Sequence, residues 1–296
     1  MTGRRLPAWA RPSEDVRLAG PASLDDLSAA WAWGGATGLG VRVAVVDSGV
    51  DADHEALDGR VDEDGGVEVV AGADGGVEVR AGPHRDSFGH GTACAGIVHA
   101  IAPDATITSV KVLGDRLGAT GAAFARGLEW AVAARFDVIN LSLGTSRRDL
   151  ALRFHDLCDD AYFHGSLIVT AASNTGRPSY PSTYASVASV ACNLARDPFR
   201  FHFNPDPPTE FLARGVDVEA PWRAGTRVRT TGNSYAAATL TGIAALVRSK
   251  HPDLRPFQLK TVLWATAANV LEAGREAPAR SLSRSLARRG AGGGRR

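Results

Sequence analysis

Residues 41–47 read VRVAVVD and follow Gly40. A short apolar, β-branched run bounded by a glycine and an aspartate is typical of a buried strand in a parallel sheet. Similar runs recur along the chain at residues 107–112, 138–143, 167–171 and 187–192. The sequence therefore predicts a central, mainly parallel sheet.

Helical segments are expected between these strands, over residues 90–101, 122–135, 150–163 and 234–250. Alternating strands and helices of this length predict an α/β fold, here a three-layer α/β/α sandwich. Such sheets bind ligands at the carboxyl ends of their strands. Asp47, Ser142 and Asn174 lie at or just past the ends of predicted strands, so we expect the functional site at that edge.

The chain divides into three parts. Residues 1–30 form an N-terminal extension, with a short helix expected from Ser23 to Trp33, and residues 31–278 form the main domain. Residues 279–296 are rich in Arg, Ser and Gly, so we expect a basic, disordered tail. The motif DGGVEV occurs at 64–69 and again at 74–79, which predicts a small surface β-hairpin.

Composition indicates a compact protein. The 296 residues are 44% hydrophobic and 22% charged, and the formal charge of +1 gives no reason to expect a nucleic-acid partner. We find no apolar run long enough to span a membrane and no secretory signal, so a cytoplasmic location is expected. The odd set Cys94, Cys158 and Cys192 lacks metal-type spacing and is expected to stay reduced.

Three residues have the chemistry of a nucleophilic site. Ser234 opens an Ala-rich helix, His90 opens another between two glycines, and Asp47 ends a strand. A serine needs a base within hydrogen-bond reach and a third group that orients the base. Taken singly, each residue also fits an ordinary role, as a turn cap, a surface histidine or a helix N-cap. Together, and in this order, they favour a catalytic triad.

The motifs around these residues resemble those of the subtilisin-like serine proteases (subtilases), from about Gly40 to about Ala268. The order Asp, His, Ser is that of subtilisins among the convergent triad proteases. The segments 47–51 (DSGVD) and 90–96 (HGTACAG) match the family's aspartate and histidine motifs. The resemblance implies that Asn174 lies in the oxyanion hole. It also implies that an extended peptide adds as a strand between two backbone segments, Leu117, Gly118 and Ala119 on one side and Ser142, Leu143 and Gly144 on the other.

The chain departs from the family pattern in several places. Asn233 stands where threonine is usual, Ser173 replaces a glycine, and Ala238 replaces a proline. The loop and the aspartate that hold the tight calcium ion in secreted subtilisins are missing, and Ala56 stands in place of that aspartate. We therefore expect no metal and no other cofactor.

The resemblance implies a cytoplasmic serine endopeptidase that acts through an acyl-enzyme on a dedicated protein or peptide. We expect a monomer without nucleic-acid or membrane partners. Two alternatives stay open. A pseudoprotease would bind peptides without cleaving them, and a transpeptidase or macrocyclase of ribosomal peptides would differ only in the fate of the acyl-enzyme.

Overall fold

The computed structural model describes residues 26–73 and 76–274. Most of the N-terminal extension (1–25), the hairpin tip (74–75) and the tail (275–296) lie outside the described residues. The predictions about the tail and about the domain limits therefore stay predictions.

The core of the fold is a nine-stranded sheet in the order β3-β2-β4-β1-β5-β6-β7-β9-β8. The seven inner strands, from β2 through β9 in the spatial order just given, pair in parallel. The two outermost strands, β3 and β8, each pair antiparallel to their neighbour. The five predicted strands appear as β1 (Arg42–Asp47), β4 (Thr106–Lys111), β5 (Val138–Leu141), β6 (Leu167–Ala171) and β7 (Ala188–Asn193). The sheet is completed by β2 (Val67–Ala71) and β3 (Val77–Ala81) at one side and by β9 (Phe211–Arg214) and β8 (His202–Phe203) at the other.

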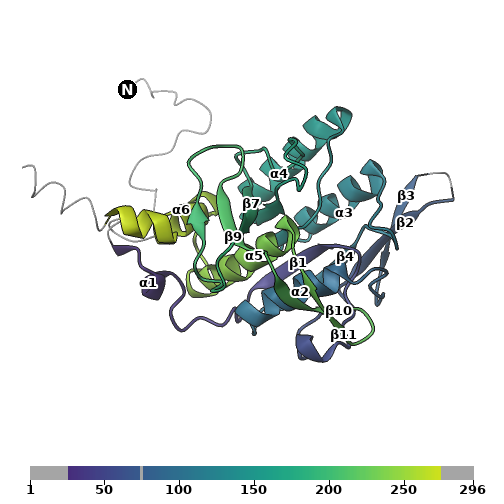
Figure 1. Cartoon of the computed structure of the whole chain (residues 1–296). Helices are drawn as coiled ribbons and strands as arrows, with labels where there is room; N and C mark the ends of the chain where they lie inside the picture. Colours follow the sequence, from purple (N-terminus) through teal and green to yellow (C-terminus); the bar gives the residue numbers. More distant parts are fainter. Residues whose placement is uncertain (1–25, 74–75, 275–296) are drawn as a thin grey trace, which may run out of the picture.

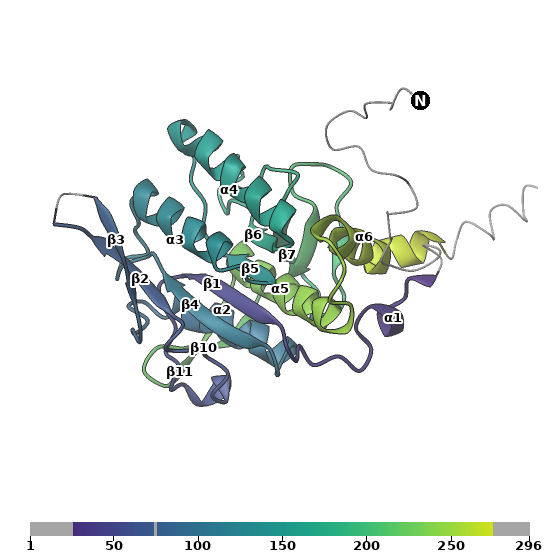
Figure 2. The same cartoon turned by 180° about the vertical axis from the view of Figure 1, so that it is seen from behind.

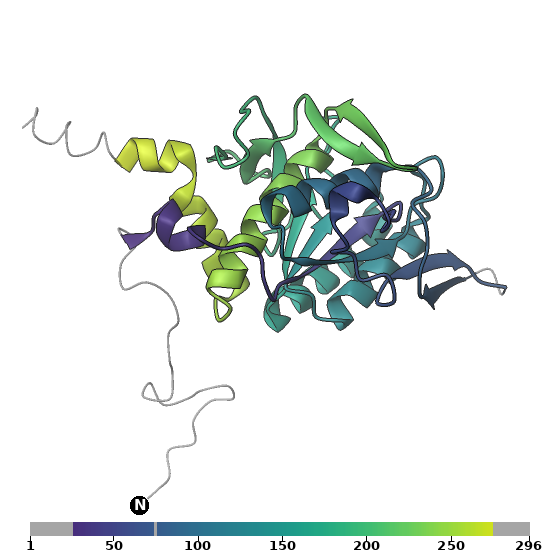
Figure 3. The same ribbon diagram turned by 90° about the horizontal axis from the view of Figure 1, so that it is seen from below.

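Helices cover both faces of the sheet. One layer contains α2 (His90–Ile101) and α5 (Asn233–Lys250), and the other contains α3 (Gly121–Ala133) and α4 (Ala151–His164), as Figure 1 and Figure 2 show from opposite sides. The alternation along β1 explains the two layers, because Val43 and Val45 pack into the core with α2 and α5, whereas Ala44 and Val46 pack against the α3 and α4 side. Figure 3 shows the layers from a third direction. The predicted three-layer α/β/α sandwich is confirmed.

Small residues bring α5 close to its neighbours. Ala236, Ala237 and Ala238 are fully buried, and a Cβ on Gly242 would lie 2.7 Å from the Cβ of Ile101 in α2. A larger side chain at 242 would therefore push the two helices apart. This close packing fixes the beginning of α5 against the sheet.

Some elements differ from the predictions. The predicted hairpin is confirmed as β2 and β3. Of the helix predicted at 23–33, residues 23–25 lie outside the described residues, and in the described part α1 spans Ala29–Trp33. Ser28 caps it, because its hydroxyl accepts the Trp31 N–H. Helix α6 (Pro256–Thr266) and the ribbon of β10 (Val218–Trp222) and β11 (Thr226–Thr230) were not predicted. Among the described residues, no helix is long and apolar enough to cross a membrane.

Candidate active site

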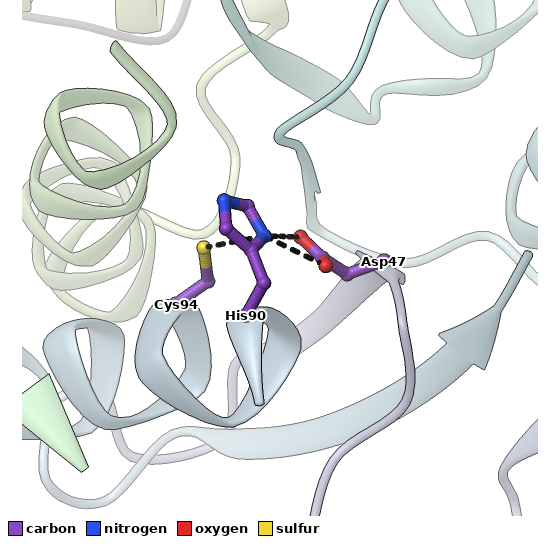
Figure 4. Close-up of side chains that lie close together, drawn as sticks. All are labelled: Asp47, His90 and Cys94. Carbon is purple, nitrogen blue, oxygen red and sulfur yellow. Dashed lines mark hydrogen bonds and ion pairs between the residues drawn. The ribbon is translucent and has the colours of Figure 1, made fainter. Parts of the chain in front are cut away.

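Asp47 and His90 form a close pair at the carboxyl edge of the sheet. Asp47 ends β1 and is fully buried, and both its carboxylate oxygens accept from His90 Nδ1, at 2.8 and 2.9 Å. The Ser48 N–H also donates to Asp47 Oδ1 at 2.7 Å. Figure 4 shows the carboxylate facing the ring of His90, which projects from the first turn of α2. This arrangement places the Nδ1 proton between the two groups and leaves Nε2 directed away from Asp47.

Two glycines allow His90 to approach Asp47. Gly89 has φ +116°, and a Cβ there would lie 2.4 Å from the Trp222 ring. A Cβ on Gly91 would lie 2.0 Å from the carbonyl oxygen of Gly49, in the turn after Asp47. The sequence GHG at 89–91 is therefore a steric requirement of this contact.

Asp86 anchors the beginning of α2, a role that the sequence analysis missed. Its buried carboxylate accepts five hydrogen bonds, from Ser48 Oγ, Phe88 N, Gly89 N, and Thr92 N and Oγ1, at 2.7–2.9 Å. Ser48 directly follows Asp47 in the chain, and the other donors lie before and after His90. The sequence signal for this role was an acidic residue three positions before the N-cap of a helix. The hydrogen bond between Asp86 and Ser48, however, forms only in the folded chain.

Ser234 lies in the first turn of α5 and is 7% exposed. Its hydroxyl donates to the Ser142 carbonyl at 3.0 Å, and no hydrogen bond joins it to His90 among the described residues. The Ser234 backbone N–H has no hydrogen-bond partner within the described part of the chain, because it belongs to the first turn of the helix. It is free to serve as a donor to a bound group.

Asn233 explains how the loop with Asn174 is held. The Asn233 side chain accepts from Cys192 N and donates to the carbonyls of Ala172 and Ser173, and the Asn233 backbone N–H donates to Asn174 Oδ1. The Asn174 amide nitrogen is left without a partner in the described segments. Asn233 therefore connects the loop of residues 172–174 to the beginning of α5, and its own side chain is used in these hydrogen bonds.

The predicted site residues lie around one cleft of about 710 Å³. His90, Ser234 and Asn174 contribute to its wall, while Asp47 lies behind His90. Both predicted peptide-binding segments line the same cleft: Leu117, Gly118 and Ala119, with Ser142, Leu143 and Gly144. The structure thus brings together all ten predicted residues. It adds lining residues that the sequence analysis did not identify, among them Thr120, Phe124, Thr145 and Arg147.

The environment of His90 favours its protonated form. Burial is the largest single influence and lowers the pKa of His90, but the charge and the hydrogen bond of Asp47 outweigh it, so that the pKa of His90 is raised. Burial raises the pKa of the Cys94 thiol, which keeps it neutral. Cys94 Sγ lies 4.0 Å from His90 Nδ1 and 3.4 Å from Ser142 Oγ.

Asp47, His90 and Cys94 are also the group of metal-type donors found in the described part of the chain, with ligand atoms within 4.8 Å of one another. A set of one oxygen, one nitrogen and one sulfur atom does not suit calcium, which prefers oxygen ligands. The carboxylate of Asp47 and Nδ1 of His90 are already joined by hydrogen bonds, so this cluster is part of the site described above.

Comparison with known proteins identifies the family. Residues 38–292 match the model of the subtilase family. The chain belongs to the subtilase family. It is 32% identical to subtilisin DY of Bacillus licheniformis, over 80% of this chain and 86% of that protein. It is 31% identical to subtilisin E of Bacillus subtilis, where the match covers 79% of this chain but only 62% of the relative.

Solved structures agree. A lanthipeptide protease matches with a TM-score of 0.61 and 26% identity, covering 74% of this subtilase and 77% of that chain. A cold-adapted subtilisin-like serine proteinase matches with a TM-score of 0.61 at 23% identity, over 75% and 80% of the two chains, which shows the shared fold. The chain is therefore a subtilisin-like serine peptidase, a hydrolase, as the sequence predicted.

Proposed function

We propose that this subtilase is a serine endopeptidase in which Asp47, His90 and Ser234 form the catalytic triad. The observation that carries the proposal is the double hydrogen bond of Asp47 to His90 Nδ1, beside a cleft that both His90 and Ser234 line. Asp47 would fix the tautomer of His90 and leave Nε2 as the base. The two predicted peptide-binding segments in the same cleft support a peptide as the substrate.

In the first step, Ser234 Oγ attacks the carbonyl carbon of the scissile bond while His90 Nε2 takes its proton. The hydroxyl now donates to the Ser142 carbonyl, so it must turn toward His90 when substrate binds. Such rearrangement is common, because catalytic hydrogen bonds often tighten only in the substrate complex. The Asp47 carboxylate stabilises the imidazolium that forms.

The oxyanion needs donors that point at its developing charge. The free Ser234 backbone N–H and the Asn174 amide nitrogen suit this role, because Asn174 Oδ1 already accepts from Asn233. The N-terminus of α5 adds a partial positive charge on the same side. A preorganised donor of this kind typically contributes about 10²–10³ in kcat.

The tetrahedral intermediate collapses when the C–N bond breaks and His90 returns its proton to the leaving amine. The acyl group stays on Ser234 until water, deprotonated by His90, attacks its carbonyl carbon. The ester C–O bond then breaks, His90 returns the proton to Ser234 Oγ, and the carboxylate product leaves. A transpeptidase would replace this water with an amine. Mass spectrometry of the products separates the two, because hydrolysis adds one water to the sum of the fragments.

The substrate and location belong to the proposal as well. We propose a dedicated protein or peptide substrate in the cytoplasm and action as a monomer. The similarity to a protease of lanthipeptides supports a dedicated peptide. The three free cysteines support a reducing compartment. Cell fractionation with an antibody against the chain tests the location.

Labelling with a fluorophosphonate probe tests the mechanism. We expect the probe to modify Ser234 in the folded chain and expect Ser234→Ala to lose both labelling and peptide cleavage. Because this hydroxyl makes one hydrogen bond, to a carbonyl, we expect the variant to fold normally by circular dichroism. A folded wild-type chain that binds peptides but neither labels nor cleaves would instead be a pseudoprotease.

A further inference from the structure

The cleft contains one side chain with a permanent charge. Among the residues that line it in the described part of the chain, Arg147 is the only arginine, and no lysine or carboxylate is present. Arg147 lies three residues after Gly144, at the end of a peptide-binding segment. The cleft therefore offers a cation to a bound peptide and nothing that would attract a basic one.

An ion pair orients the guanidinium group of Arg147. Asp149 binds it through two parallel contacts, from Nε at 3.2 Å and from Nη2 at 2.5 Å. The remaining nitrogen, Nη1, has no hydrogen-bond partner among the described residues. It lies 3.6 Å from the position that a Cβ on Gly121 would occupy. Gly121 and Arg147 both line the cleft, so this nitrogen without a partner lies beside the cleft wall.

The backbone under Arg147 is also held in place. Thr145 exchanges two backbone hydrogen bonds with Tyr180, at 2.9 and 2.8 Å, and Thr145 Oγ1 accepts the Arg147 N–H at 3.2 Å. Arg147 thus extends from an anchored segment, and its planar group is already oriented by Asp149. Such preorganisation reduces the entropy that is lost when a further anion binds.

We infer that Arg147 is a specificity-determining residue that selects peptides with a glutamate or aspartate among the residues bound along the cleft. This inference rests on the proposed endopeptidase function. The substrate carboxylate would accept from Nη1 while Asp149 keeps Nε and Nη2. Because Arg147 and Asp149 are both largely exposed, at 61% and 59% of their side chains, the effect is modest and screened by salt.

The test uses quenched-fluorescence peptides that differ only in Glu, Gln or Lys, placed at one position at a time on either side of the scissile bond. At low ionic strength we expect kcat/KM for Glu to exceed that for Gln by about two- to fivefold at one position, the range typical of exposed ion pairs. The preference for Glu should shrink in 0.5 M NaCl, because the Debye length is only roughly 4 Å at that concentration and exposed charges are screened.

Three variants separate Arg147 from general surface charge. Arg147→Gln should abolish the preference for Glu, and Asp149→Asn should increase it by freeing the guanidinium group. Arg148→Gln is the matched control, because it removes the same charge from the next residue, which does not line the cleft. It should leave the preference unchanged.

The outcomes distinguish this inference from the proposed function. Equal rates for Glu and Gln at every position, or a preference that survives in Arg147→Gln, would overturn the role of Arg147 while leaving the endopeptidase in place. A folded chain that neither labels with fluorophosphonate nor cleaves any of the peptides would overturn both.

Discussion

Replacing Asp86 by asparagine tests how the Asp47–His90 pair is held. Asparagine has nearly the same shape but only one oxygen. With that oxygen in the Oδ1 position it keeps the donors Ser48, Phe88 and Gly89, and its NH₂ group then faces the Thr92 N–H. Two donors oppose each other there, and the Thr92 N–H is left buried and unpaired.

The cost follows from these bonds. A buried donor without a partner costs about 1–3 kcal/mol, and the loss of a charged acceptor weakens the bonds that remain. We therefore expect Asp86→Asn to lower the free energy of unfolding by about 2–4 kcal/mol. For a domain of this size that corresponds to a fall of roughly 5–15 °C in Tm.

Catalysis should suffer as well, because the weakened bonds flank His90. A small misplacement of a catalytic group costs up to about 10²-fold in rate, so we expect kcat to fall by about 10- to 100-fold. KM should change little, since Asp86 does not line the cleft. Thermal unfolding by circular dichroism and steady-state kinetics well below both Tm values measure the two effects.

Asp51→Asn provides the matched control. Asp51 is also 6% exposed, and its carboxylate accepts from Asp86 N and Ala224 N but from no residue between 88 and 92. We expect a comparable loss of stability with a smaller effect on kcat. Wild-type behaviour of Asp86→Asn would refute the anchoring role of Asp86, and so would a fall in kcat in Asp51→Asn as large as that in Asp86→Asn.

Three other predictions follow from the site. Only neutral His90 acts as a base, so its raised pKa predicts that kcat/KM falls as pH decreases, with a midpoint above pH 6.5. Asp47→Asn should move this midpoint to lower pH. A wild-type midpoint at or below pH 6.5 would contradict the raised pKa of His90. Asn174→Leu should lower kcat by about 10²–10³ with little change in KM, whereas a large rise in KM would indicate a distorted cleft. EDTA should change neither activity nor Tm, and a fall in Tm that calcium restores would reveal a metal site that the sequence and the structure did not indicate.

The fold was largely predictable because its strands are buried on both faces. The run at 41–47 is apolar at nearly every position, as a central parallel strand requires. The ribbon of β10 and β11 was missed, since β11 is mostly exposed and lacks such a run. Helix α6 carried its own signal, Pro256 at its first position with Gln258 bonding back to the Arg255 N–H, which the sequence analysis did not use.

The site was predictable where short motifs define it. Asp47, His90 and Ser234 could be proposed from the sequence because each lies in a distinctive local motif, and the structure places them around one cleft. Asp86 was not found, because the meaning of its carboxylate depends on Ser48, 38 residues earlier in the chain. Arg147 was missed for a similar reason, since its position beside Gly121 arises only when the segment after β5 meets the beginning of α3.

The place of α5 in the chain bears on when activity can arise during synthesis. This helix supplies Ser234, and its fully buried alanines fill the core between α2 and the sheet. Asp47 and His90 leave the ribosome long before α5, and domains tend to fold as units. A nascent chain that ends before residue 234 thus lacks Ser234, the proposed nucleophile, and the buried residues of α5 that fill the centre of one core layer. We therefore expect truncated chains that end before α5 to have no proteolytic activity, because the proposed nucleophile and its supporting helix are made late in synthesis.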